Sequence, residues 1–469
     1  MSAEEQTQDA GGSADAYRIG EGGVWANAWK VMAVLAAVGI AGAVVGALSD
    51  PERFAFSYLF AFAVAMTLAM GGLFLVFVQF LTAAGWGISV RRTAEFVMAG
   101  TPVLALLVIP VLASHGTLYE WAHVGHGEHE DEHGDAEGEP HGDAGLDELI
   151  GVPSARAQDH GEDVGHPKGA EHTLFADMSM EEHTPMEEAL HHELLAFKTS
   201  TWYTTGFWIA RSIGYLAIWI LLALTYFRWS TKQDRTRDPQ LTVRMQKLAP
   251  VAAILFGLTL TFAGFDWVMS LEPVWYSTIY GVYLFAGSAM AIFALVIVIT
   301  LSQRDHGLLG NAVNVEHYHD LGKLMFGFVC FWAYVAFSQW MLIWYASIPE
   351  ETTYYHRRWS DGWQVVSMLL ILGHFAAPFL YLISRVPKRK LAMLKAGAAW
   401  LLFMHVVDMY WFVMPYAGGA FSPHWLDVAC LFAVVGLFFS VVFFVMRKYP
   451  LLPIGDPRLA RALHHHQTQ

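Results

Sequence analysis

The residues best suited to chemistry are ionisable side chains inside apolar segments. His405 and Asp408 are three positions apart in the apolar run 391–413, so they share one face of a helix. His374 lies near the middle of the run 364–384 and is followed by Pro378, which frees backbone carbonyl groups and often kinks a helix. A histidine beside a carboxylate can pass protons, because imidazole titrates near neutrality and the carboxylate orients it. The alternative is a structural hydrogen-bonded pair between helices.

Two further groups of polar residues are candidates for the same proton route. Arg211 lies about two turns into the run 205–228, and Asp266 lies near the end of the run 248–269. They suggest a polar network between these two runs or part of a relay. A polar cluster precedes the run 324–347 and consists of His317, His319, Asp320 and Lys323. It would either be the entry point for protons from the cytoplasm or simply form a solvated helix start. We find no metal-ligand motif, dinucleotide fingerprint or phosphate loop, so we expect no redox cofactor or metal bound by this chain and no catalytic residue.

These residues lie in a chain whose composition is that of a membrane protein. Of its 469 residues 55% are hydrophobic and 15% charged, and its mean hydropathy is +0.38, whereas soluble domains are about 25% charged. Ten apolar runs reach the length of about 20 residues that a helix needs to cross a bilayer. They span 31–48, 57–81, 96–114, 205–228, 248–269, 275–301, 324–347, 364–384, 391–413 and 425–446. The sequence therefore predicts an all-α integral membrane protein with about ten transmembrane helices.

The distribution of charge predicts the orientation and the domain organisation. If residues 1–28 are cytoplasmic, the inner connections carry 19 Lys and Arg and the outer ones carry six, which places both termini in the cytoplasm. Helices 1–3 then occupy 29–115, helices 4–10 occupy 204–446, and 447–469 form a cytoplasmic tail. The formal charge of −14 argues against a nucleic-acid partner.

The segment 116–203 is a separate feature and would lie on the periplasmic face. It contains 21 of the 42 carboxylates and 11 of the 22 histidines, with too little apolar content to fold alone. We interpret it as a largely flexible loop. A loop that collects Zn²⁺ or Cu²⁺ is the alternative, because imidazoles among carboxylates suit these ions.

Two stretches point to a family. They are TFAGFDWVMSLEPVWYSTIYGVYLFAG (261–287) and LGKLMFGFVCFWAYVAFSQWMLIWYASIPEET (321–352). Both closely resemble the ActF family, integral membrane subunits of bacterial alternative complex III, which is a quinol:cytochrome c or quinol:electron-acceptor oxidoreductase. The resemblance implies an NrfD-like (polysulfide-reductase-C-like) fold: two four-helix bundles of inverted topology and two additional helices. The acidic loop is not a recognised feature of that family.

The resemblance also implies partners and a location. It implies a bacterial inner-membrane complex with c-type cytochrome subunits, a periplasmic iron–sulfur subunit and the paralogous NrfD-like subunit ActC. Haems and iron–sulfur clusters are expected in those partners, and quinol is the substrate of the complex. The expected role is to scaffold the complex in the lipid bilayer and to provide a proton-translocation route. Direct quinol binding, a stand-alone secondary transporter and a metal-ion transporter are the alternatives.

Overall fold

The residues that the structure describes form a bundle of ten long helical spans. The computed structural model describes residues 17–123, 195, 197–200, 202–310 and 312–464, and within these ranges it contains helices and no strand. Ten helical spans are long and apolar enough to cross a membrane, which confirms the predicted multi-pass all-α architecture. The uninterrupted spans are α2 (Val24–Ser49), α3 (Pro51–Leu81), α9 (Thr205–Thr236), α10 (Pro239–Trp267), α11 (Tyr280–Asp305), α12 (Val315–Ala346), α17 (Leu391–Val413) and α18 (Trp425–Lys448).

The remaining two spans are interrupted. The third contains α4 (Ile88–Ala99), η2 (Thr101–Val103), α5 (Leu104–Leu107) and α6 (Ile109–Ala113), with Pro102 and Pro110 at the breaks. The eighth contains α14 (Trp363–Leu369), the π-helix η6 (Leu370–Ala376) and α15 (Ala377–Ile383), which has Pro378 in its first turn. The kink that Pro378 predicts therefore takes the form of a π-helical segment.

Several helices begin earlier than the apolar runs indicate. The third span begins at Ile88 rather than 96, the fifth at Pro239 rather than 248, and the seventh at Val315 rather than 324. Polar caps set two of these starts: Asp238 accepts from the amide of Gln240 ahead of α10, and Asn314 forms a capping box ahead of α12. The helices thus extend beyond the apolar layer, which hydropathy alone does not detect.

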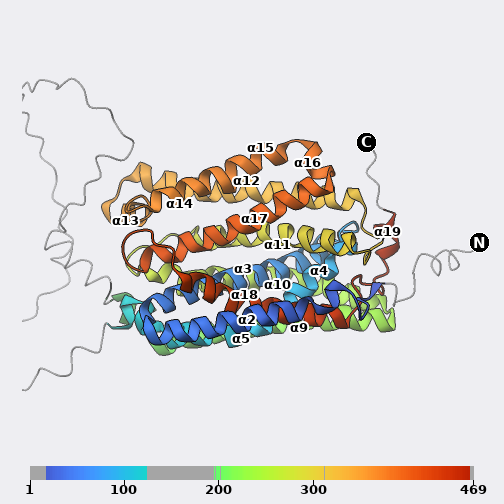
Figure 1. Cartoon of the computed structure of the whole chain (residues 1–469), viewed down its shortest axis with the longest axis horizontal. Coiled ribbons are helices and arrows are strands. Elements are labelled where there is room, and N and C mark those ends of the chain that lie inside the picture. Colours follow the sequence, from blue (N-terminus) through green and yellow to red (C-terminus); the bar gives the residue numbers. More distant parts are fainter. Residues whose placement is uncertain (1–16, 124–194, 196, 201, 311, 465–469) are drawn as a thin grey trace, which may run out of the picture.

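The helices form two four-helix bundles and an additional pair. In the first bundle α3, α4–α6, α9 and α10 pack in a ring; in the second, α11, α12, α14–α15 and α17 do the same. The central helices α3 and α11 are the most buried and pack against each other. The additional helices α2 and α18 pack together and cover α3 (Figure 1).

The two bundles run in the same direction. Because successive spans alternate in direction, α3 and α11, four spans apart, both begin at the same end of the molecule (Figure 1). Helices in the same position of the two bundles therefore run in the same direction. The inverted topology that the resemblance implied is therefore wrong for these bundles.

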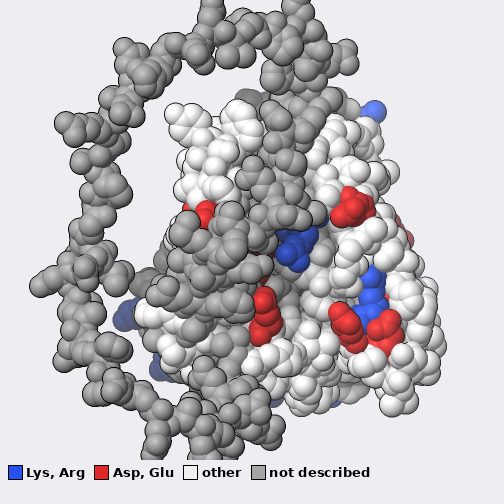
Figure 2. Space-filling view, turned by 90° about the vertical axis from the view of Figure 1, so that its left-hand side faces the viewer, with Lys and Arg blue, Asp and Glu red and all other residues white. Residues whose placement is uncertain are grey.

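The two ends of the molecule differ. At the end that we call the terminal end, the first and last described segments meet, with the amide of Leu451 donating to the carbonyl of Tyr17 at 2.8 Å. The first and the last described residues therefore lie at the same end of the molecule, as an even number of spans predicts (Figure 1). The opposite, hairpin end carries η5 (Met269–Leu271), the connection 272–279 and α13 (Pro349–Arg357). Figure 2 shows acidic and basic side chains interspersed on that end.

Some of the sequence predictions concern residues outside the described ranges. One is the interpretation of 116–203 as a flexible or metal-binding loop, because 124–194 lie outside the described residues. The other is the polar N-terminal segment 1–28, of which 1–16 lie outside them. Which end of the molecule faces the cytoplasm remains a prediction of the charge count.

Candidate functional site

Asp408 is a buried carboxyl group that has no cationic partner in the described part of the chain. It lies near the hairpin end of α17 with none of its surface exposed. The indole N–H of Trp332 on α12 donates to Asp408 Oδ2 at 3.0 Å, while Oδ1 has no hydrogen-bond partner among the described residues. Burying a carboxylate with one neutral donor is costly, whereas a protonated carboxyl group is accommodated more easily. The site therefore suits a group that changes its protonation state.

His405 lies one turn before Asp408 and presents a free ring nitrogen. Its Nε2 lies 2.9 Å from the hydroxyl of Thr67 on α3. That hydroxyl donates to the carbonyl of Ala63 at 2.8 Å, so its oxygen accepts from His405 and the Nε2 atom carries the proton. His405 Nδ1 has no hydrogen-bond partner among the described residues and can therefore accept a proton.

Gly287 on α11 makes room beside this pair. A Cβ atom at this position would lie 3.4 Å from His405 Nδ1 and 3.5 Å from Asp408 Oδ2. The backbone of the central helix thus approaches both groups closely, and the pair faces the junction of the two bundles. The sequence prediction that His405 and Asp408 share a helix face agrees with this geometry, although no hydrogen bond joins the two side chains directly.

His374 and Asp408 both contact Trp332. The imidazole lies in the π-helix η6, is fully buried, and has no hydrogen-bond partner at either nitrogen within the described part of the chain. Its ring packs against the indole of Trp332 with centroids 4.0 Å apart and planes at 30°. Trp332 therefore contacts His374 with its face and Asp408 with its N–H group. Trp332 could not be recognised from the sequence, because a tryptophan in an apolar run usually indicates only packing.

Asp266 on α10, in contrast, is held as a carboxylate. Arg211 on α9 donates to both oxygens at 2.8 Å, Tyr215 donates to Oδ2 at 2.8 Å, and Trp202 donates to Oδ1 at 3.1 Å. Each oxygen thus accepts two hydrogen bonds. The polar network of Arg211 and Asp266, one of the two interpretations from the sequence, is present, and its geometry is that of a fixed ion pair.

The two carboxyl groups occupy corresponding places in the two bundles. Asp266 lies in the fourth helix of the first bundle and Asp408 in the fourth helix of the second. Each is followed seven residues later by a proline, Pro273 and Pro415. The fourth helices of the two bundles therefore carry corresponding carboxyl groups, one paired with arginine in the first bundle and one without a cationic partner among the described residues in the second.

The polar cluster that begins α12 lies at the terminal end. His317 belongs to the capping box with Asn314, and its Nε2 contacts the carbonyl of Ala462 at 3.0 Å. Asp320 pairs with Lys323 at 2.7 Å, and the Lys323 side chain is 48% exposed. Twelve residues of helix, or about 18 Å, separate Asp320 from Trp332. The structure thus does not bring this cluster, which includes the buried His319, into contact with the Asp408 group.

A second buried charge network at the terminal end was not anticipated. Glu95 pairs with Arg91 at 2.8 Å and with Arg92 at 3.1 Å. Arg91 also pairs with Asp456 at 2.9 Å. Burial alone would raise the pKa of Asp456, but Arg91 and Arg458 hold it well below its usual value. The network ties α4 to the segment after α18, and hydropathy missed it because these charges precede the apolar run.

Arg358 is a buried cation at the hairpin end. It is 1% exposed, donates to the carbonyls of Tyr354 at 2.9 Å and Phe412 at 3.1 Å, and lies 3.5 Å from the centre of the Tyr354 ring. The hydroxyl of Tyr416 donates to Glu272 at 2.7 Å and lies 3.4 Å from Arg358. Burial raises the pKa of the Tyr354 hydroxyl although Arg358 acts in the opposite direction. This end of the second bundle is thus closed by aromatic rings and one positive charge.

The fold and these groups define a polytopic helical membrane protein with an unpaired carboxyl group in its second bundle. Among the described residues, no group of three or more His, Cys, Asp or Glu side chains is arranged to hold a metal ion. No known protein-family model matches the chain, and no curated protein is significantly similar to it.

Proposed function

We propose that the chain is the integral membrane subunit of a respiratory quinol:electron-acceptor oxidoreductase of the alternative complex III type, similar to ActF. In this proposal it scaffolds c-type cytochrome subunits, an iron–sulfur subunit and a paralogous NrfD-like subunit in a bacterial inner membrane. It passes protons through its second bundle, while partner subunits carry the haems and iron–sulfur clusters that handle electrons.

The placement of the two family-like stretches supports this proposal. Residues 261–287 contain Asp266, the hairpin-end connection and the first turns of α11 with Gly287. Residues 321–352 form most of α12 and supply Trp332. Both stretches thus contribute to the surroundings of the two carboxyl groups rather than to the lipid-facing surface alone.

The observation that carries the proton route is the unpaired state of Asp408. A buried carboxyl group near neutrality is expected to be held by a cation, as Asp266 is, unless it must exchange a proton. Asp408 has one neutral donor, Trp332, and an adjacent imidazole, His405, with a free acceptor nitrogen. Protonation of Asp408 and of His405 Nδ1 can alternate beside Gly287, where both atoms face the α11 backbone.

The positions of His374 and Trp332 divide this route into two parts. Neither nitrogen of His374 has a hydrogen-bond partner among the described residues, and the indole of Trp332 contacts both His374 and Asp408. Transfer between them requires the indole to move, or a water to bridge past it. The π-helical backbone around His374 supplies a segment that can change its hydrogen bonding locally.

Asp408→Asn tests the proposal in the intact complex. The amide keeps the shape and can still accept from Trp332, so we expect normal assembly and near-normal quinol oxidation in detergent. Proton translocation in sealed vesicles should fall at least tenfold. Asp305→Asn is the matched control, because Asp305 forms an exposed ion pair with Lys395 at the terminal end.

Two results would overturn the proposal. If the purified full-length chain carried no co-migrating haem or iron and transported a solute alone, it would be a stand-alone transporter. If Asp408→Asn and His405→Gln both translocated protons normally, the pair would be interhelical hydrogen-bonding groups without a role in the route.

A further inference from the structure

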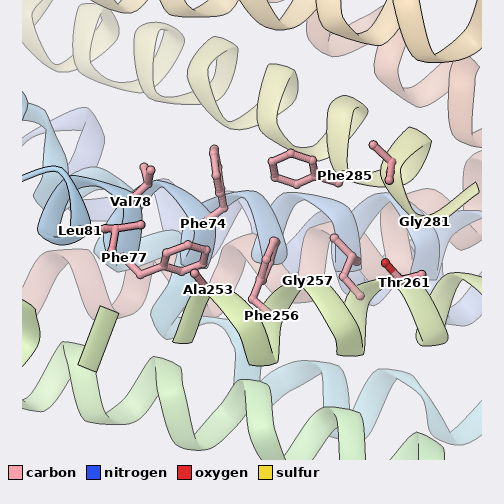
Figure 3. Close-up of a pocket in the computed structure, with 12 residues that line it drawn as sticks. Phe74, Phe77, Val78, Leu81, Ala253, Phe256, Gly257, Thr261, Gly281 and Phe285 are labelled. Carbon is pink, nitrogen blue, oxygen red and sulfur yellow. The ribbon is translucent and has the colours of Figure 1, made fainter. Parts of the chain in front are cut away.

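An apolar groove runs along the outside of the first bundle. It lies where α3, α10 and α11 meet and has a volume of about 310 Å³ (Figure 3). Four phenylalanine rings form most of its walls: Phe74 and Phe77 from α3, Phe256 from α10 and Phe285 from α11. The hydroxyl of Thr261 is the only side-chain oxygen or nitrogen among the lining residues. The groove thus offers contact to a hydrocarbon and almost no hydrogen bonding.

The shape and place of the groove suit a single extended chain. Its lining residues on α10 extend from Ala253 to Thr261, which corresponds to about 12 Å along the helix axis. It opens sideways, because Ile254 and Leu258 beside it on α10 are 65% and 55% exposed. These residues lie within an apolar membrane-spanning helix, so the opening faces the acyl chains of the bilayer.

The side of α10 that faces the groove leaves space for this chain. A Cβ atom on Gly257 would meet no atom within 4 Å. At the corresponding junction of the second bundle, three apolar side chains of α18 close the gap and leave a cavity of about 180 Å³; they are Leu431, Val435 and Phe439. No described helix covers the groove of the first bundle in this way. An unfilled apolar surface loses packing contacts, so an apolar occupant is favoured.

A positive charge lies near one end of the groove. Lys247 is exposed, and no ion pair with it is found among the described residues. It lies seven and eleven residues before Ile254 and Leu258, hence on the same stripe of α10 and about 10 Å from Ile254 along the axis. A lysine at the polar end of a membrane helix can reach the interface and hold a lipid phosphate.

We propose that this groove binds one acyl chain of a bilayer phospholipid whose phosphate is held by Lys247. The apolar walls select a hydrocarbon chain, and the lysine selects an anionic head group. The site lies between the first bundle and α11, and Asp408 and His405 are not among its lining residues, so the inference does not rest on the proposed proton route.

Gly257→Phe tests this proposal because it places a ring in open space inside the groove. The full-length protein is purified with its complex in mild detergent, and its retained lipids are measured by native mass spectrometry and by extraction. We expect at least a tenfold loss of one tightly held phospholipid. Gly214→Phe on α9 is the matched control, since its Cβ position is also open and lies outside the groove.

Lys247→Gln tests the head-group contact separately. We expect the retained phospholipid to fall at least threefold, whereas Arg228→Gln, which removes an exposed cation on α9 outside the groove, should change little. Equal phospholipid retention in wild type and Gly257→Phe would refute the proposal, as would an isoprenoid quinone as the species that Gly257→Phe displaces. If Gly257→Phe does not fold, the smaller Gly257→Leu substitution provides the same test.

Discussion

The contrast between the two carboxyl groups predicts very different costs of substitution. Arg211→Met removes the cation and two of the four hydrogen bonds that Asp266 accepts. Asp266 is fully buried, so it would be left as an uncompensated charge. Removing one partner of a buried pair costs about 3–5 kcal/mol, which lowers the ratio of folded to unfolded protein by a factor of more than about 100.

Asp408→Asn provides the comparison within the same chain. The amide oxygen can still accept from Trp332, and no ion pair is broken. We therefore expect a change of about 1 kcal/mol or less in the free energy of unfolding. Unfolding is followed by circular dichroism in mixed micelles with increasing mole fraction of a denaturing detergent, for wild type and both variants under one set of conditions.

The double variant tests the cause of the large loss. Adding Asp266→Asn to Arg211→Met removes the charge that the first substitution exposes, so part of the stability should return. If Arg211→Met cost no more than Asp408→Asn, or if the double variant were the sum of its parts, the interpretation of Asp266 as a fixed ion pair would be wrong.

Three further predictions concern other parts of the molecule. Trp332→Phe keeps a ring against His374 but removes the hydrogen-bond donor to Asp408. Proton translocation should therefore fall about tenfold, which corresponds to about 1.4 kcal/mol in the activation barrier, while quinol oxidation in detergent is retained. An unchanged rate of proton translocation would exclude a role for the indole N–H. Because the pKa of Asp456 is lowered in the folded state, its stabilisation is full above about pH 4 and is lost at lower pH. Asp456→Asn should remove this stabilisation at pH 7, and the loss should be detected as faster proteolysis of the segment after α18. Protection from proteolysis equal to that of wild type would contradict this reasoning. Thr278 is exposed at the hairpin end. If this end is periplasmic, Thr278→Cys should react with an impermeant thiol reagent added from the periplasmic side and not with reagent added from the cytoplasmic side. The neighbouring Ser270 is buried and is therefore unsuitable as a labelling position.

The membrane-spanning architecture could be predicted from the sequence because hydropathy reports it directly. Each of the ten apolar runs corresponds to one helical span, and the errors are at the ends, where polar turns extend the helices. The two bundles run in the same direction because α3 and α11 are an even number of spans apart in the chain. The family resemblance had instead implied bundles of inverted topology.

The candidate site was only partly predictable. The shared face of His405 and Asp408 follows from helix periodicity, and the pairing of Arg211 with Asp266 was one of two interpretations. Contacts between helices do not follow from periodicity, so neither the contacts of Trp332 with His374 and Asp408 nor the network of Arg91 with Asp456 could be deduced. Arg358 was counted only as a loop charge, because its aromatic surroundings come from distant segments.

The contacts at the terminal end have a consequence for biosynthesis. Arg91 is translated early, but its partner Asp456 is translated only after α18. Ala462, whose carbonyl contacts the imidazole of His317, follows still later. Since chains fold from the N-terminus during synthesis, Arg91 can pair with Glu95 early but gains its second carboxylate partner only with this late segment. A protein interrupted shortly after α18 would contain all ten membrane-spanning helices of the described chain and still lack the ion pair of Arg91 with Asp456, so its terminal end would be less firmly closed than that of the finished fold.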